Sequence, residues 1–402
     1  MRSKRAVLAA PVPPAEGAGW FGPATRQIAL PLLAYRCSFF GLICLCRRLL
    51  PNIFSEGNYR LNFHWPAEAL PGPAAFLKTW DAQHYLFLSQ HGYAGAGESA
   101  RFFPLWPLAI KVGSYLCFGH PLVAALVLAN LFSFIGVLLF HDLVARNRGS
   151  ETADASALLL LAFPGALFFA LPYAESLFFL LCVLLFHALS RGRTWPAALA
   201  AFCLPLARPV GALAAIPLFL ILTTPPRRRP AGWGQAGGPL IAIGLGLVVF
   251  FQFMRLNTGD ILTIFKVYGS LHTANSMSRV FAVPDFLMSL FSLRELPPPL
   301  DLTVSLIDRM TFLLFLTAAW RLWRTDRFYF WFALPLGLIS SMSATSFTGV
   351  TRFTVVIFPI FIAAGAALSG ETRRGWRALA LAVLFAVQIA LLIRHINNWW
   401  VA

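Results

Sequence analysis

The sequence predicts an all-α polytopic membrane protein that forms a single integral membrane domain over residues 1–402. Of the 402 residues, 58% are hydrophobic and only 12% are charged, whereas about a quarter of the residues of a soluble domain are charged. The mean hydropathy is +0.70. Apolar runs of about 17 or more residues, enough to cross a hydrocarbon core, recur along the whole chain. The alternating pattern of a membrane β-barrel is not visible.

The apolar runs predict about eleven membrane crossings, two of them short. The predicted spans lie at roughly 28–46, 121–144, 155–171, 175–190, 195–206 with 208–223, 238–255, 302–320, 328–343, 353–369 and 378–395. The region around Arg208 permits either one long helix or two short helices that meet at Ala207-Arg208-Pro209. Proline breaks a helix because it removes a donor and clashes with the preceding turn.

The basic residues decide between these arrangements. They give a formal net charge of +16 and stand at the ends of the apolar runs, which is typical of membrane topology and not of a nucleic-acid interface. If residues 1–27 form a cytoplasmic tail and the chain turns back at Arg208, every short inner loop is rich in arginine. The short outer turns PYAES and SATSFTGVT carry no basic residue before Arg352. The positive-inside pattern therefore favours two short helices.

Two long segments then fall on the outer side, at 47–120 and 256–301. Within the first, FPLWPLAIKVGSYLCF (103–118) predicts a helix that lies in the membrane interface. Its expected anchors are Trp106, Lys111 and Tyr115. The six cysteines of the chain form no CxxC pair, so the sequence suggests neither a zinc site nor a disulfide framework.

The first outer loop also holds the most polar short stretch, WDAQHYLFLSQHGY (80–93). We expect a helix from Trp80 to His91, capped by Thr79 and ended by Gly92. On such a helix Asp81 and His84 are neighbours at i, i+3. His91 lies about 80° from Asp81 around the helix axis, so one stripe carries an acid and two imidazoles.

Three interpretations of this stripe are open. It could be a capped interfacial helix whose acid only satisfies backbone donors. It could be a metal site of Asp81, His84 and His91, although two histidines two turns apart are too distant to chelate one ion without bending. It could also hold a general base, in which Asp81, oriented by the neighbouring imidazole, removes a proton from an incoming hydroxyl.

Four segments resemble the PIG-V family, the GPI mannosyltransferase 2 group and its bacterial relatives. WDAQHYLFLSQHGY resembles the WDAxHY/F…GY segment of their first long outer loop. RFFPLWPLAIK (101–111), AFPGALFFALPYAESLFFLL (162–181) and ARPVG (207–211) resemble the three segments that follow in the family. These matches come in family order and span most of the N-terminal half. The second half is similar only through TRF (351–353) before a span.

The resemblance implies a C-type glycosyltransferase bundle, a lipid-phosphate-sugar donor and an active site on the outer face. Asp81 falls where that superfamily keeps its first-loop catalytic acid. The relatives take mannose from a polyprenyl phosphate carrier. The arginine-rich composition and the lack of an N-x-S/T sequon suggest a bacterial inner (plasma) membrane, with the N-terminus cytoplasmic and the active site periplasmic or extracellular. Since bacteria lack GPI anchors, the acceptor would be another lipid- or glycan-linked hydroxyl.

The expected reaction is inverting transfer. Asp81 takes the acceptor proton, His84 orients Asp81 or the donor phosphate, and nearby cations stabilise the leaving phosphate. The outer cations that could bind it are Arg208, Arg255, Lys266, His272 and Arg352. The alternatives to a binding role are snorkelling for Arg208 and Arg352, and a solvated helix face for Lys266 in DILTIFKVYG.

Further substrate-binding candidates are Trp80, Tyr173 and Glu175. Because a carboxylate between two apolar spans wants a partner, Glu175 is expected to pair with Arg208 or to bind sugar hydroxyls, unless it only caps a helix. The inner-end residues His141, Asp142 and His187 are interpreted as structural.

No cofactor is expected to be required. No GxGxxG or P-loop segment indicates a nucleotide, and the lack of a DxD pair argues against an essential divalent metal without excluding one. The expected partners are the polyprenyl-phosphate sugar donor, the acceptor, membrane lipids and a small membrane subunit of the kind some relatives need, and no nucleic acid. A transporter or lipid flippase is the alternative, which would place charged residues in mid-span and show inverted repeats.

Overall fold

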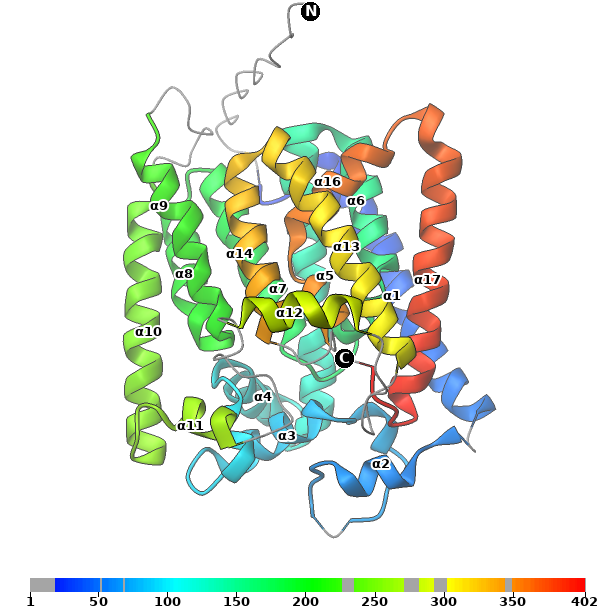
Figure 1. Cartoon of the computed structure of the whole chain (residues 1–402), viewed down its shortest axis with the longest axis vertical. Helices are drawn as coiled ribbons and strands as arrows, with labels where there is room; N and C mark the ends of the chain where they lie inside the picture. The colour runs from blue at the N-terminus through cyan, green and yellow to red at the C-terminus, as the bar shows by residue number, and fades with distance from the viewer. Residues whose placement is uncertain are drawn as a thin grey trace, which may run out of the picture.

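A computed structural model describes residues 19–50, 53–67, 69–225, 235–270, 282–292, 302–343 and 349–401. Within these ranges every regular element is a helix. Long helices run side by side as a bundle, and short helices gather at one end of it (Figure 1). The bundle helices are α1 (Pro23–Leu49), α5 (Pro121–Arg148), α6 (Ser150–Ala162), α7 (Glu175–Ser190), α8 (Thr194–Ala207), α9 (Ala215–Thr223), α10 (Gly237–Thr258), α13 (Leu302–Thr325), α14 (Arg327–Ser343), α16 (Phe358–Leu368) and α17 (Arg374–Ile396).

The all-helical prediction is confirmed for the described residues. Five helices, α1, α5, α10, α13 and α17, are each long and apolar enough to cross a membrane. Every predicted span contains a helix, but the count of about eleven crossings stays a prediction, because several of the remaining helices are short. Two predicted spans are interrupted before or at a proline. The run 155–171 divides into α6 and the 3-10 helix η4 (Pro164–Phe169), and the run 353–369 into α15 (Val350–Thr354) and α16.

The chain reverses at Arg208, as the charge pattern predicted. Arg208 has extended backbone angles between α8 and the 3-10 helix η5 (Pro209–Ala214), which leads into α9. A contact at the other end of α8 supports this reversal. Thr194, at the start of α8, donates a hydrogen bond to Gln235, just before α10 begins. The chain has therefore returned by residue 235 to the end of the bundle where α8 started.

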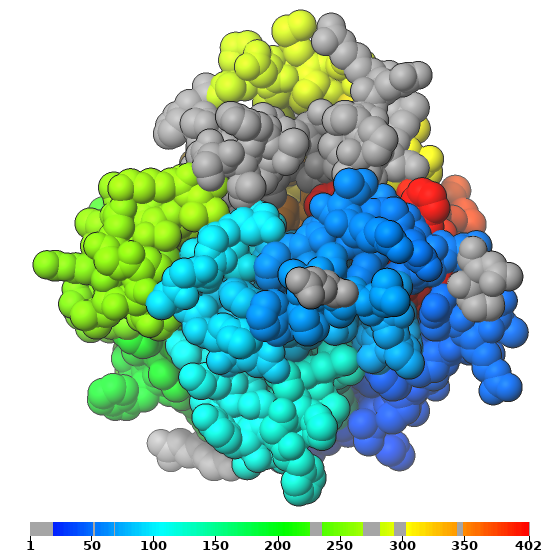
Figure 2. Space-filling view, turned by 90° about the horizontal axis from the view of Figure 1, so that it is seen from below, coloured from blue at the N-terminus to red at the C-terminus, as the bar shows by residue number. Residues whose placement is uncertain are grey.

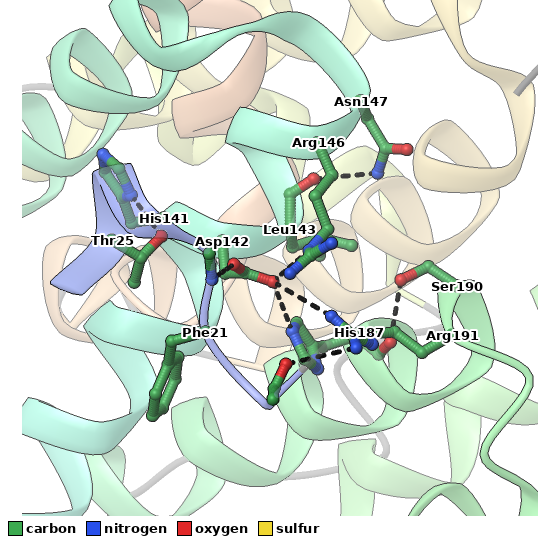
Figure 3. Close-up of polar contacts among 12 residues, drawn as sticks. Phe21, Thr25, His141, Asp142, Leu143, Arg146, Asn147, His187, Ser190 and Arg191 are labelled. Carbon is green, nitrogen blue, oxygen red and sulfur yellow. Dashed lines mark hydrogen bonds and ion pairs between the residues drawn. The ribbon is translucent and has the colours of Figure 1, made fainter. Parts of the chain in front are cut away.

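One end of the bundle is tied together by a buried carboxylate (Figure 3). Asp142 on α5 accepts from the backbone N–H of Gly22 at 2.7 Å, from Arg146 at 2.5 Å and from His187 of α7 at 2.9 Å. The neighbouring His141 contacts Thr25 of α1 at 2.9 Å. These contacts join α1, α5 and α7, which agrees with the structural role predicted for this group.

The opposite end is built mainly by the first outer loop. Its elements are α2 (Glu56–Leu61), the 3-10 helix η2 (Ala75–Leu77), α3 (Asp81–His91), the 3-10 helix η3 (Gly97–Arg101) and α4 (Leu105–Leu116). Viewed onto this end, the blue to cyan loop covers the middle of the surface (Figure 2). The short helices α11 (Thr263–Ser270) and α12 (Val283–Phe291) complete the edge of this end.

Helix α4 confirms the helix predicted within 103–118, but the prediction that Trp106 anchors it in the membrane interface was wrong. Trp106 has no exposed surface, and its indole N–H donates to the carbonyl oxygen of Pro172 at 3.4 Å. Its ring faces Phe132 of α5, so this residue fixes the loop to the bundle and does not face lipid. Lys111 and Tyr115 are exposed.

Candidate active site

Asp81 begins α3, and the helix ends at Gly92 as expected from its positive φ of 76°. The start of the helix differs from the prediction. The cap position is Trp80, whose φ of 51° is unusual for a residue other than glycine. Thr79 does not cap the helix, because its hydroxyl bonds to Nε2 of His395 at 2.8 Å. The side chain of Thr79 is thus used to attach α17 to the loop.

Asp81 belongs to an ion-pair quartet, which we define as Asp81, Glu175, Arg208 and Arg352. Arg352 on α15 donates to Oδ2 of Asp81 at 2.5 Å and also to Oε1 of Glu175. Arg208 donates to the same oxygen of Glu175 at 2.5 Å. The predicted pairing of Glu175 with Arg208 is therefore confirmed, and Arg352 extends it to Asp81. Two acids and two arginines leave the quartet formally neutral.

The members of the quartet differ in accessibility. The side chain of Glu175 is fully buried, those of Arg352 and Arg208 are 6% and 11% exposed, and that of Asp81 is 22% exposed. Asp81 is therefore the carboxylate that an incoming molecule can reach. The second carboxylate oxygen of Glu175, Oε2, has no hydrogen-bond partner among the described residues.

Aromatic rings enclose the guanidinium of Arg352. It lies 4.7 Å from the ring centre of Tyr173 and 5.2 Å from that of Phe168, within the range of favourable cation–π contacts. The hydroxyl of Tyr173 donates to the backbone oxygen of Thr79 at 2.8 Å. Tyr173 thus links the short turn before α7 to the residue that precedes the WDAQHY motif.

The electrostatic environment keeps Asp81 ionised. Burial by itself would raise the pKa of this carboxyl, but the positive charges of Arg352 and Arg101 outweigh that effect and hold the pKa below its ordinary value. At neutral pH Asp81 is consequently a carboxylate that can accept a proton. The same interactions make it a weaker base than an ordinary carboxylate, because Arg352 stabilises the charged form.

His84 does not orient Asp81 directly, which corrects the expectation drawn from their helical spacing. Its Nε2 lies 3.3 Å from a guanidinium nitrogen of Arg101, and its Nδ1 lies 2.8 Å from the hydroxyl of Ser99. Burial and the charge of Arg101 lower the pKa of His84 to about 3, so the ring is neutral. Since a guanidinium can only donate, Nε2 accepts and Nδ1 carries the proton that is donated to Ser99.

The structure does not bring together all of the other predicted residues. Lys266 is 70% exposed and pairs with Asp260, and Arg255 is exposed near the end of α10. His91 packs against the rings of Trp65 and Phe87. His272 lies outside the described residues.

No group of three metal-ligating side chains occurs in the described part of the chain. A metal site made of Asp81, His84 and His91 is therefore not formed.

Trp80 lies under the C-terminal residues. Its ring meets that of Trp400 edge-on at 4.8 Å, and its buried indole N–H has no hydrogen-bond partner in the described ranges. The adjacent Trp399 donates from its indole to the carbonyl oxygen of Ile53 at 2.8 Å. The C-terminal end thus closes over the first outer loop beside the quartet.

One residue that supports the site was not predicted. Asp308, in the second turn of α13, is fully buried. Its two oxygens accept the backbone N–H groups of Gly349 and Thr351 at 2.6 and 2.7 Å. It thereby fixes the start of α15, the helix that carries Arg352. The sequence signal was an acid within an apolar span, which usually has a defined partner.

Asp308→Asn is expected to lower the free energy of unfolding by about 1–3 kcal/mol. The NH2 group of the asparagine would face one of the two buried backbone N–H groups, and two donors cannot form a hydrogen bond. The measurement is thermal unfolding in detergent. Asp285→Asn, at an exposed acid in the first turn of α12, is the control and should change little. Equal midpoints for Asp308→Asn and the wild type would contradict this supporting role.

The helical bundle thus carries an accessible, ionised carboxylate at one end. Comparison with known proteins finds similarity in the segment that holds this carboxylate. The family model described as mannosyltransferase (PIG-V) matches residues 72–216. The GPI alpha-1,6-mannosyltransferase 2 proteins of Cricetulus griseus and Rattus norvegicus are each 35% identical to the chain over 135 residues, and that of Homo sapiens over 136. No solved structure matches the chain.

The similarity is confined to one segment of the chain, which resembles part of the PIG-V mannosyltransferases. The curated alignments cover 31% of this chain and 27% of each relative, so the chain matches about a quarter of their length. The segment 72–216 contains Asp81, Glu175 and Arg208, whereas Arg352 lies beyond it.

Proposed function

We propose that the protein is a membrane mannosyltransferase that moves mannose from a polyprenyl-phosphate carrier to an acceptor hydroxyl on the outer face of the membrane. The observation that carries the proposal is the position of Asp81. It is the accessible carboxylate of the quartet, it starts the helix of the WDAQHY motif, and it lies within the segment shared with PIG-V mannosyltransferases.

In the proposed reaction the acceptor oxygen attacks the anomeric carbon from the side opposite the lipid phosphate. The new carbon–oxygen bond forms as the bond from the sugar to the phosphate breaks, so the configuration inverts. Asp81 accepts the proton of the acceptor hydroxyl. The bonding electrons leave with the polyprenyl phosphate, whose negative charge needs preorganised donors and cations nearby.

Within this proposal the quartet has two tasks. Arg352 keeps Asp81 ionised and fixes the direction of its carboxylate. Glu175 and Arg208 hold Arg352 in place from the buried side. The exposed pair of Lys266 and Asp260 takes no part in the bond-forming step, and Lys266 remains a candidate for contact with the lipid headgroup region.

The proposed location is the bacterial inner membrane, with the N-terminus in the cytoplasm. The arginine-rich loops support this orientation, because the positive-inside rule then puts α3 and the quartet on the outer side. The acceptor would be a lipid- or glycan-linked hydroxyl of the periplasmic or extracellular side, and a small membrane subunit is a further proposed partner.

The test is reconstitution of the purified protein in vesicles with radiolabelled polyprenyl-phosphate mannose. A membrane extract from the source cells supplies the acceptor and any partner subunit. We expect label to move from the carrier to an acceptor in the presence of the protein, and not in vesicles without it. Parallel reactions with polyprenyl-phosphate glucose and pentose test the sugar. Transfer of neither mannose nor the other sugars under these conditions would contradict the proposed function.

A further inference from the structure

The charge balance of the quartet bears on which cation binds the phosphate of the lipid carrier. Arg208 and Arg352 are the arginines closest to Asp81 in the hydrogen-bond network, but each already has a carboxylate partner within the quartet. Their two positive charges are already balanced by Asp81 and Glu175, so a phosphate bound there would add an uncompensated negative charge to a largely buried cluster, which is costly. A cation without a buried anionic partner is better suited to the task.

Arg101, the last residue of η3, has this property. One of its guanidinium nitrogens lies 3.3 Å from the neutral His84 ring. Another lies 3.4 Å from Glu98, a 42% exposed acid three residues earlier in the chain, while the Arg101 side chain itself is 17% exposed. Because Glu98 lies at the surface, its ion pair contributes little free energy and is easily exchanged. An incoming phosphate can therefore replace Glu98 at low cost.

The position of Arg101 relative to Asp81 also fits. In an inverting transfer the base and the leaving phosphate lie on opposite sides of the anomeric carbon. The cation for the phosphate must therefore be near the base without contacting it. Arg101 is close enough to help lower the pKa of Asp81, yet forms no ion pair with it among the described contacts. Arg352, in contrast, bonds directly to Asp81.

The orientation of Arg101 is fixed by a chain of polar contacts. Ser99 accepts from Nδ1 of His84, and Nε2 of His84 accepts from Arg101. The His84 ring is itself stacked on Phe63 with centroids 4.1 Å apart, and the guanidinium lies 5.0 Å from the ring centre of Phe102. A planar guanidinium held in this way keeps several donors for an oxyanion.

Three other cations of the loop, beyond the end of α1, lack this arrangement. Lys78 donates to the carbonyl oxygen of Trp65, Lys111 is exposed on α4, and Arg60 pairs with Glu56 at the surface.

We propose that Arg101 binds the phosphate of the polyprenyl-phosphate substrate, with the neutral His84 as the residue that positions its guanidinium. This inference rests on the proposed function, because it specifies how the same site holds the donor. It assigns Arg101 to donor binding and leaves Arg208 and Arg352 to the carboxylates.

The first experiment measures binding and needs no sugar transfer. Polyprenyl phosphate without a sugar is titrated into the wild type and variants in lipid nanodiscs. Arg101→Gln should weaken binding about ten- to a hundred-fold, the range for a lost hydrogen bond to a charged group. Arg101→Lys should bind with intermediate affinity. Lys111→Gln, which removes the same charge from an exposed site of the same loop, should change the dissociation constant less than twofold. Equal losses in Arg101→Gln and Lys111→Gln would overturn the inference.

The second experiment uses only the wild type, so it does not depend on the folding of a variant. Modification of Arg101 by phenylglyoxal is followed by mass spectrometry with and without polyprenyl phosphate. Protection of Arg101 supports the inference, and unchanged modification overturns it. A protein that binds polyprenyl phosphate through Arg101 but transfers no sugar would contradict the proposed function alone. A protein that transfers mannose while Arg101 stays unprotected would contradict the assignment of Arg101 alone.

Discussion

Asp81→Asn should abolish mannose transfer while the protein still folds. A positioned general base typically contributes about a hundred- to ten-thousand-fold to the rate, and an amide cannot accept the acceptor proton. The fold should persist because Arg352 keeps its second partner, Glu175, and because Asp81 is the most exposed member of the quartet. The measurement is the initial rate of transfer in the reconstituted system, with thermal unfolding as the check on folding.

Glu56→Gln is the matched control for this variant. Glu56 is an acid of the same loop, it is 65% exposed, and its partner Arg60 is also at the surface. Its removal should leave the rate unchanged. Normal transfer by Asp81→Asn would show that Asp81 is not the base.

The pH dependence distinguishes a base from a purely structural carboxylate. The folded-state pKa of Asp81 lies below its ordinary value, so the active, ionised form dominates from about pH 5 upward. The transfer rate should therefore show no acidic limb, that is, no fall with decreasing pH, above about pH 5. Arg352→Gln removes the positive charge that contributes most to lowering the pKa of Asp81. Burial then raises this pKa, so the acidic limb of the rate profile should move to higher pH. The same acidic limb in both proteins would exclude titration of Asp81 as its cause.

Glu175→Gln should cause the largest loss of stability in the site. Glu175 is fully buried and receives hydrogen bonds from both arginines of the quartet. Removing one partner of a buried ion pair typically costs about 3–5 kcal/mol, because an uncompensated charge remains in the interior. We expect a clearly lower midpoint of thermal unfolding in detergent and a lower yield of folded protein.

The double variant Glu175→Gln with Arg208→Gln tests the physical cause. It removes one charge of each sign, so Arg352 can pair with Asp81 and the quartet is neutral again. The double variant should therefore be more stable than Glu175→Gln alone. If the second substitution restored nothing, charge imbalance would not be the reason for the loss. Glu56→Gln again serves as the exposed control, with an expected change of less than about 1 kcal/mol.

The sequence predicted what depends on local pattern and on charge. Apolar periodicity located the helices, and the arginine distribution correctly placed the reversal at Arg208. The end of the Asp81 helix at Gly92 and the pairing of Glu175 with Arg208 were also predicted correctly, because a helix-ending glycine and the need of a buried acid for a partner determine them.

The long-range contacts could not be predicted in this way. Arg352 is 271 residues from Asp81 in the chain, and His395 is 316 residues from Thr79. The residue pattern of one helix does not specify which distant side chain will form a hydrogen bond with that helix. The errors share this cause: Thr79, His84 and Trp106 each bond to a partner outside their own helix and therefore do not take the local roles expected of them.

The origin of the quartet in three distant parts of the chain has a consequence for biosynthesis. Asp81 and Glu175 are translated before Arg352, and until residue 352 emerges Arg208 is the one arginine of the quartet that is present. The nascent N-terminal half therefore carries one excess negative charge at the future site. That charge is neutralised when α15 docks, which couples completion of the site to insertion of the C-terminal half. A chain arrested before residue 349 should thus lack the ion-pair partner of Asp81.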